Sequence, residues 1–155
     1  MGLPHISNPI TLRASAVLPA AGAWDATPLE VIVSNLHWIT LYISFTRGEA
    51  AGVLDLQLQW SPYSQTVAVV QNWFPMTAYA TGGVAAGADT TSLTQREIMS
   101  YTPTGAAIEN FIYGPVEFRD TAQRLRVLGR DIGVQVAEPG TLHIVGVATQ
   151  AQIIL

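Results

Sequence analysis

The chain has 155 residues and no cysteine, so it fits one domain of ordinary size and excludes disulfide bonds and cysteine-based zinc sites. Charged residues make up 12% of the sequence and hydrophobic residues 49%, whereas about 25% of a typical soluble domain is charged. So few charged residues leave much of the surface of a folded chain without ionised groups. We therefore expect part of its surface to be buried against other chains.

All seven basic residues are arginines, and the net charge is −4. With this acidic balance we expect no binding to nucleic acid. Residues 1–15 contain no basic segment followed by an apolar run, so no secretory signal is predicted. No stretch approaches the ~20 apolar residues that cross a bilayer, and we expect no membrane partner.

Short apolar runs separated by Gly, Pro, Asn and Ser recur along the whole chain, which is typical of a β-sandwich or barrel. The predicted strands cover 10–18, 29–34, 38–46, 53–60, 66–71, 96–101, 107–113, 116–118 and 141–148. Residues 53–60 alternate most regularly and predict one dry and one wet face. The dry face holds Leu54, Leu56, Leu58 and Trp60, and the wet face holds Asp55, Gln57 and Gln59. In 10–18 the predicted apolar face holds Ile10, Leu12, Ala14 and Ala16.

Two stretches lack this clear alternation. Residues 119–131 fit a helix, which would group Ala122, Leu125 and Leu128, or a strand with Leu125 and Val127 inward and Arg124 and Arg126 outward. We favour the strand because Gly129 would interrupt a helix. Residues 73–92 show no periodicity and predict a long irregular loop.

These elements predict a single all-β domain over residues 1–155, an antiparallel β-sandwich of jelly-roll type with about 8–10 strands. Residues 1–9 and 150–155 are candidates for extended arms. The arms and the loop 74–92 are expected to contact neighbouring subunits or a capsid.

The sequence contains no catalytic or cofactor-binding motif of the kinds that identify hydrolases, metalloproteases, nucleotide-binding or calcium-binding proteins. His5, His37 and His143 have no partner at metal-ligand spacing, although three histidines could still converge in space. Glu117 and Asp120 form the closest carboxylate pair, and the arginines beside them favour ordinary ion pairs. We predict a protein that is not an enzyme and has no catalytic residues, cofactor or metal.

Arginines concentrate near the end of the chain, where acidic residues are interspersed with them. The arginines are Arg119, Arg124, Arg126 and Arg130, and the acids are Glu117, Asp120 and Asp131. They fit either a solvated strand face that neutralises itself or a belt that pairs with acids of a neighbouring chain. The four arginines together with Trp73 and Phe74 are our candidate interface residues.

Aromatic residues offer a second kind of site, a platform on which sugar rings stack. The aromatics that could form it are Trp24, Trp38, Trp60, Tyr63 and Trp73. Trp60 and Tyr63, at the end of a predicted strand, are the best local candidates. Tryptophan and tyrosine are also ordinary core and interface residues, so this interpretation competes with simple packing.

The one-sided strand 53–60 and a predicted closing hairpin of 124–127 with 139–145 give the chain a pattern that resembles jelly-roll decoration or accessory proteins of tailed-bacteriophage particles. The resemblance implies a homo-oligomer, with a trimer favoured, located in the virion after synthesis in the host cytoplasm. It also implies binding to the major capsid protein or another virion protein, and mechanical reinforcement of the shell. The alternative function is a carbohydrate- or receptor-binding module of a phage tail or baseplate.

Overall fold

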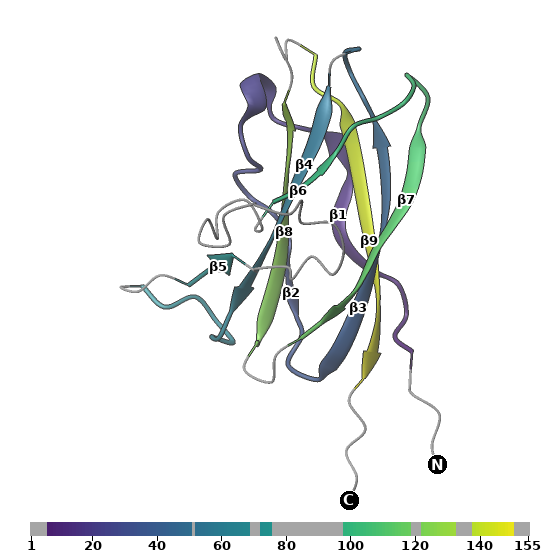
Figure 1. Cartoon of the computed structure of the whole chain (residues 1–155). Coiled ribbons are helices and arrows are strands. Elements are labelled where there is room, and N and C mark those ends of the chain that lie inside the picture. Colours follow the sequence, from purple (N-terminus) through teal and green to yellow (C-terminus); the bar gives the residue numbers. More distant parts are fainter. Residues whose placement is uncertain are drawn as a thin grey trace, which may run out of the picture.

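The structure, a computed structural model, describes residues 6–50, 52–68, 72–75, 98–118, 122–132 and 138–150. The strands in these residues form two antiparallel sheets that face each other, and the predicted β-sandwich is confirmed (Figure 1). The four-stranded sheet has the order β1 (Ile10–Val17), β9 (Thr141–Gln150), β3 (Leu36–Thr46) and β7 (Glu109–Glu117). The five-stranded sheet runs from β2 (Glu30–Ile32) through β8 (Arg124–Ile132) to β4 (Val53–Ser61), whose other edge pairs with β5 (Phe74–Pro75) and β6 (Ile98–Tyr101).

The strand pairs are nested along the chain. The first strand pairs with the last, β2 pairs with β8, β3 pairs with β7, and β4 pairs with β6 and β5. Successive strands from β1 to β4 alternate between the two sheets, as do those from β6 to β9. The lateral pairs of β9 with β3 and of β8 with β4 then join these nested pairs into two sheets. The predicted closing hairpin of 124–127 with 139–145 is therefore wrong, because β8 and β9 lie in different sheets.

The core lies between the sheets and is supplied by every second residue of the central strands. On β3, Ile39, Leu41, Ile43 and Phe45 are buried, and on β4 the predicted dry residues Leu54, Leu56 and Leu58 are buried opposite them. Trp60 lies at the end of the same dry face and packs against this core. Each such apolar side chain stabilises the fold by about 1.5–3 kcal/mol on burial.

The ambiguous stretch 119–131 contains a strand and not a helix, as we expected. Within β8, Leu125 and Val127 point inward and are fully buried. Gly129 lies in the same strand, where an added Cβ would come within 2.6 Å of Leu142 Cδ2. A glycine here therefore lets the two sheets approach each other closely.

The predicted alternation of 10–18 is wrong beyond Leu12. The pairing of β1 with β9 shifts register between Thr11 and Arg13 and again between Arg13 and Ala16, and both Ala14 and Ala16 are exposed. The Arg13 guanidinium occupies this irregular edge and donates to the carbonyl oxygens of Leu142 and Ala16, at 2.6 and 2.9 Å. Bulges of this kind interrupt the regular ladder and blunt an edge strand.

Gly114 and Pro115 do not separate two strands, contrary to our prediction. The predicted strands 107–113 and 116–118 are one strand, β7, which passes through both residues. Gly114 adopts a φ of 120°, and the register with β3 shifts at this point. Pro115 is tolerated because β7 lies at the edge of its sheet, where its missing N–H is not needed by a neighbour.

The remaining expectations concern the loops and the ends of the chain. The strand predicted over 66–71 is absent from 66–68, and 69–71 lie outside the described residues. Most of the predicted loop 73–92 and of the predicted arms also lies outside them, although Phe74–Pro75 form β5. Ile6 bridges to Thr149, and the Ser7 N–H donates to the carbonyl of Ala148 at 2.7 Å, so this part of the 1–9 segment lies against β9.

Candidate interaction surfaces

Arg124 is the centre of a buried polar network on the outer face of the five-stranded sheet. Its side chain is only 5% exposed. The guanidinium donates to the carbonyl of Tyr63 at 2.8 Å and the hydroxyl of Ser61 at 3.3 Å, and it forms an ion pair with Glu30. These partners use the donor groups of Arg124 within its own chain, so this outward-pointing residue offers little to a neighbouring subunit.

A second ion pair lies further along the same face. Arg130 donates from Nε and Nη2 to Oδ2 of Asp55 at 2.9 and 2.8 Å, and Ser100 donates to the other carboxylate oxygen at 2.5 Å. The guanidinium carbon of Arg130 also lies 4.3 Å from the ring centre of Trp24. Asp55 is 2% exposed, which corrects our prediction that it lies on a wet face. The side chains of β6 and β8 cover it.

Arg126 lies between these two pairs and has no carboxylate partner among the residues that the structure describes. Its Nε donates to Gln59 Oε1 at 2.8 Å, and its guanidinium carbon lies 4.3 Å from the ring centre of Trp73. Glu30 is opposite Arg126 across the β2–β8 pair, but its carboxylate binds Arg124. Burial lowers the pKa of Arg126; the Arg124 guanidinium also lowers it, while Glu30 raises it. In the described residues, neither Nη1 nor Nη2 of Arg126 donates a hydrogen bond.

The predicted cluster of arginines and neighbouring acids does not neutralise itself as we described. Arg124 and Arg130 pair with Glu30 and Asp55, which are distant in sequence. Glu117 lies on the other sheet. Arg119 and Asp120 lie outside the described residues. Of the other interface candidates, Trp73 stacks on Arg124 and Arg126, and Phe74 is exposed.

Asp131 lies on the inner face of β8 and is fully buried. One carboxylate oxygen accepts a hydrogen bond from the N–H of Gly140 at 2.7 Å. Its other oxygen has no hydrogen-bond partner among the described residues. Burial raises the pKa of Asp131 above its ordinary range, and the hydrogen bond from Gly140 only partly offsets this effect.

The outer face of the four-stranded sheet has a different character because its central strands carry no acidic or basic side chain except histidine. Tyr42 on β3 lies opposite Ile112 on β7 and Val145 on β9. Tyr42 is 47% exposed and Ile112 is 64% exposed. This exposed apolar face, which we call the β3 face, consists of Trp38, Thr40, Tyr42, Ile112, Pro115, Val145, Val147 and Thr149. Such a face is typical of a contact surface.

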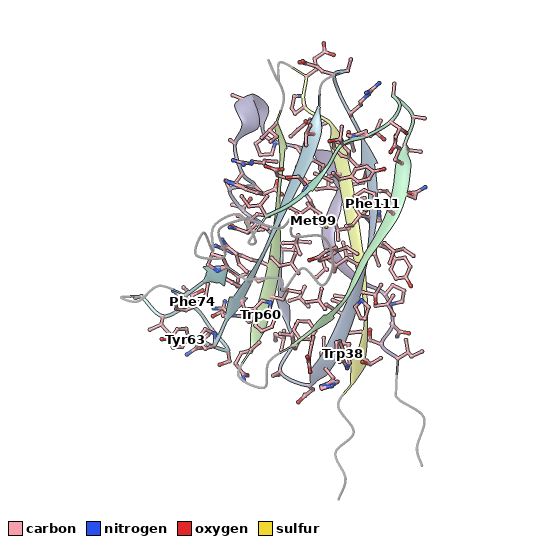
Figure 2. All side chains as sticks on the ribbon, in the orientation of Figure 1. Trp38, Trp60, Tyr63, Phe74, Met99 and Phe111 are labelled. Carbon is pink, nitrogen blue, oxygen red and sulfur yellow. The ribbon has the colours of Figure 1, made fainter. Side chains whose placement is uncertain are left out.

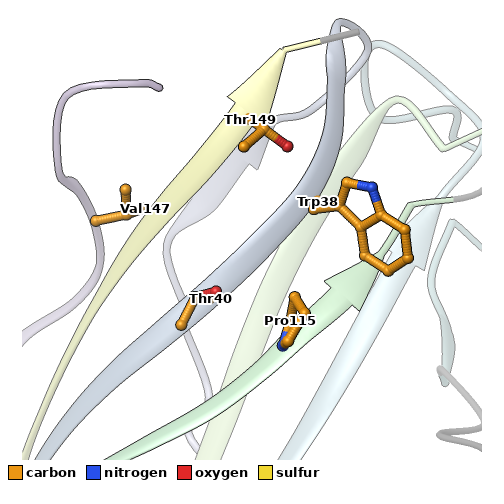
Figure 3. A pocket seen from close by; sticks show the side chains of 5 residues that line it. All are labelled: Trp38, Thr40, Pro115, Val147 and Thr149. Atoms are coloured by element: carbon orange, nitrogen blue, oxygen red, sulfur yellow. The ribbon is translucent and has the colours of Figure 1, made fainter. Parts of the chain in front are cut away.

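The β3 face contains a hollow with a volume of about 330 Å³. Figure 3 shows Trp38 and Pro115 on one side of it, Val147 on the other, and Thr40 and Thr149 between them. The Thr149 hydroxyl is buried and has no hydrogen-bond partner in the part of the chain that the structure describes. The hollow therefore combines an indole ring with hydroxyl groups.

Trp60 and Tyr63 do not form an open stacking platform. The Trp60 ring lies 5.9 Å from that of Phe118 and packs against the core. Tyr63 lies beyond the end of β4 and is half-buried, and Figure 2 shows both side chains on the five-stranded side, away from Trp38. Trp24 and Trp73 stack on arginines. Trp38, another of the five predicted aromatics, lines the hollow on the β3 face.

The histidines do not converge where the structure describes them. His37 packs edge-on against Trp38, and His143 lies on β9 opposite Ser44, while His5 is outside the described residues. No three His, Asp or Glu side chains gather as a metal site within the described ranges. Glu117 lies on the same face as Trp38, directly opposite it, and accepts no hydrogen bond or ion pair from a described residue.

Tyr42, Ile112 and Glu117 are not among the interface residues predicted from the sequence. A signal for the β3 face is nevertheless present, because neither face of 36–46 carries an acidic or basic side chain other than His37. A strand without charges on either face is typical of one that is covered on both sides.

The chain matches no protein-family model, and neither a curated protein nor a solved structure is detectably similar to it. Within the described residues, no helix has the length and apolar composition needed to span a membrane.

Proposed function

We propose that this chain is a non-catalytic structural protein of a virion, a capsid decoration protein that acts through contacts between subunits. It forms a symmetric homo-oligomer, with a trimer favoured, and binds the major capsid protein or another virion protein. The exposed β3 face carries this proposal, because Tyr42 and Ile112 present apolar surface on a rigid sheet. Covering that surface with another subunit removes it from water.

The size of the β3 face is suited to a protein contact. Its residues lie on three strands, β3, β7 and β9. Three strands spaced ~4.8 Å apart, each about nine residues long with a rise of ~3.3 Å per residue, present roughly 430 Å² of sheet. A standard interface buries about 800 Å² on each partner. The face can therefore supply about half of one such interface.

The winding of the chain supports the same proposal. Nested pairing of β1 with β9, β2 with β8, β3 with β7 and β4 with β6 supports a jelly-roll winding, in which a long antiparallel hairpin is rolled into two sheets. Viral capsid domains use this architecture, as do lectins. Because unrelated functions share the fold, the surface and not the fold decides between them.

The mass of the purified chain in solution tests the subunit contact. We expect sedimentation velocity to show an oligomer for the wild type and a monomer for the double variant Tyr42→Ser/Ile112→Ser. Val17→Ser is the matched control because Val17 is 61% exposed at the end of the edge strand β1, opposite Thr141 and outside the β3 face, and we expect it to leave the oligomer intact. A wild-type chain that is monomeric at all concentrations would contradict the proposal.

The virion assignment needs its own experiment. Immunogold electron microscopy with antibody against the purified chain would be applied to particles released from cells that carry the gene. We expect gold on the outer shell of intact particles. Label confined to material free of particles would overturn the assignment, whatever the oligomeric state.

The hollow at Trp38 favours carbohydrate binding as the second candidate function. An indole ring and threonine hydroxyls are the groups that contact the apolar face and the hydroxyls of a sugar. Glycan-array binding that is lost in Trp38→Ala and kept in Trp73→Ala would support it. Absence of binding to all sugars would leave the structural role as the better explanation.

A further inference from the structure

Arg126 and Glu117 lie on opposite faces of the sandwich, and neither has an oppositely charged partner among the described residues. Arg13, Arg124 and Arg130 each pair with a carboxylate of their own chain. Arg126 has none, although Gln59 and Trp73 already hold its guanidinium in place. Its Nη1 and Nη2 edge remains able to bind a carboxylate with two parallel hydrogen bonds.

Glu117 is the complementary group. It is exposed at the end of β7, beside Trp38 and Pro115, on a face that is otherwise almost free of acidic and basic groups. A carboxylate in such a place would lose hydration without compensation if a purely apolar surface covered the β3 face. A partner that covers this face therefore needs a cation at this position.

We infer that the β3 face of one copy packs on the outer face of the five-stranded sheet of a second copy, with Glu117 of one paired to Arg126 of the other. The inference rests on the proposed function, since it names the partner of the β3 face. Trp73 and the exposed Phe74 give the receiving face apolar surface next to the guanidinium.

The edges of the sandwich favour contact through faces over extension of a sheet. Bulges interrupt β1, Pro115 removes an N–H from β7, and β2, β5 and β6 are only 3, 2 and 4 residues long. Edges of this kind resist pairing with another strand. Contact between two different faces is heterologous, and such contacts close into rings when the rotation permits.

Charge reversal tests the pair directly. Sedimentation velocity over a concentration series would compare wild type, Arg126→Glu, Glu117→Arg and the double variant that carries both changes. We expect each single variant to raise the dissociation constant at least about tenfold and the double variant to restore most of the affinity. Glu138→Arg is the matched control, since Glu138 is also an exposed carboxylate without an ion-pair partner among the described residues, and it should leave the affinity unchanged.

The outcomes separate this inference from the proposed function. A wild-type oligomer whose affinity is unaffected by the single variants, or a double variant no better than the weaker single one, overturns the Glu117–Arg126 pair alone. A wild-type monomer overturns both. If Arg126→Glu fails to fold, Arg126→Gln removes the charge, and it should weaken association without changing the circular dichroism spectrum.

Discussion

The two outer faces of this sandwich differ in which side chains they bury and which they expose. On the five-stranded sheet, Arg124 and Asp55 are buried outside the apolar core because other side chains of the same chain satisfy them. On the four-stranded sheet, Tyr42 and Ile112 are exposed although they are apolar. Arg124 and Asp55 find their partners within the chain, whereas the exposed residues of the second face require another molecule. Stabilising and binding positions can therefore be distinguished by where their partners lie.

The largest expected effect is loss of the Arg124 network. Arg124→Ala should lower the free energy of unfolding by about 3 kcal/mol, because it leaves buried acceptors without a donor. Urea denaturation measures this change. Arg47→Ala is the control, since Arg47 contacts only the carbonyl of Ala50 in a turn and its loss should cost less than about 0.5 kcal/mol. Equal losses would remove the distinction between buried and turn arginines.

Asp55→Asn should lower the free energy of unfolding by about 2 kcal/mol, since the neutral amide weakens two hydrogen bonds from Arg130 and places donors against donors. Ser100→Ala, which removes only the third hydrogen bond, should cost about 1 kcal/mol in the same urea experiment. If Asp55→Asn is neutral, this face is not held together by its ion pairs.

Asp131 contrasts with Asp55 on the same sheet. It is also a buried carboxylate, but it has no cationic partner among the described residues. Its pKa is raised in the folded state, so the stability contribution of its protonated form is lost as pH rises from the ordinary value near 3.8 through the native pKa. Asp131→Asn removes this dependence and keeps an acceptor for Gly140. We expect the wild type to lose stability relative to the variant as pH increases from 3 to 7, by urea denaturation. Parallel pH profiles would contradict the assignment.

The smallest effect on stability is expected on the β3 face. Tyr42→Ser should change the free energy of unfolding of the dilute monomer by about 1 kcal/mol at most, because it removes two exposed cross-strand pairs, with Ile112 and Val145, and no buried residue. The same change should abolish association. A variant that unfolds the monomer would show that Tyr42 serves the fold and not a partner.

The sequence predicted the sandwich well because alternation is a local property. Leu54, Leu56 and Leu58 follow it directly, and so do Leu125 and Val127. It failed for Asp55, whose burial depends on Ser100 and Arg130, at positions 45 and 75 residues away. Contacts between such distant residues have no local periodic signature.

The irregular features were missed for a related reason. Alternation predicts which face a residue lies on only while the register is constant, and the bulges at Arg13 and Gly114 break it. The partners of Arg124 were also missed, since Glu30 is 94 residues away. The sequence favoured pairing of the arginines with acids nearby in sequence. In the fold, Arg124 and Arg130 instead pair with the distant acids Glu30 and Asp55.

The central claim is that another protein subunit covers the β3 face. Hydroxyl-radical labelling, read out by mass spectrometry at dilute and at concentrated protein, tests it with two aliphatic residues. Ile112 and Val17 are 64% and 61% exposed in the single chain, and Val17 lies at the end of β1, outside the β3 face. We predict that labelling of Ile112 falls on concentration while labelling of Val17 stays constant. Equal labelling of Ile112 in both conditions, with the oligomer formed, would contradict the account.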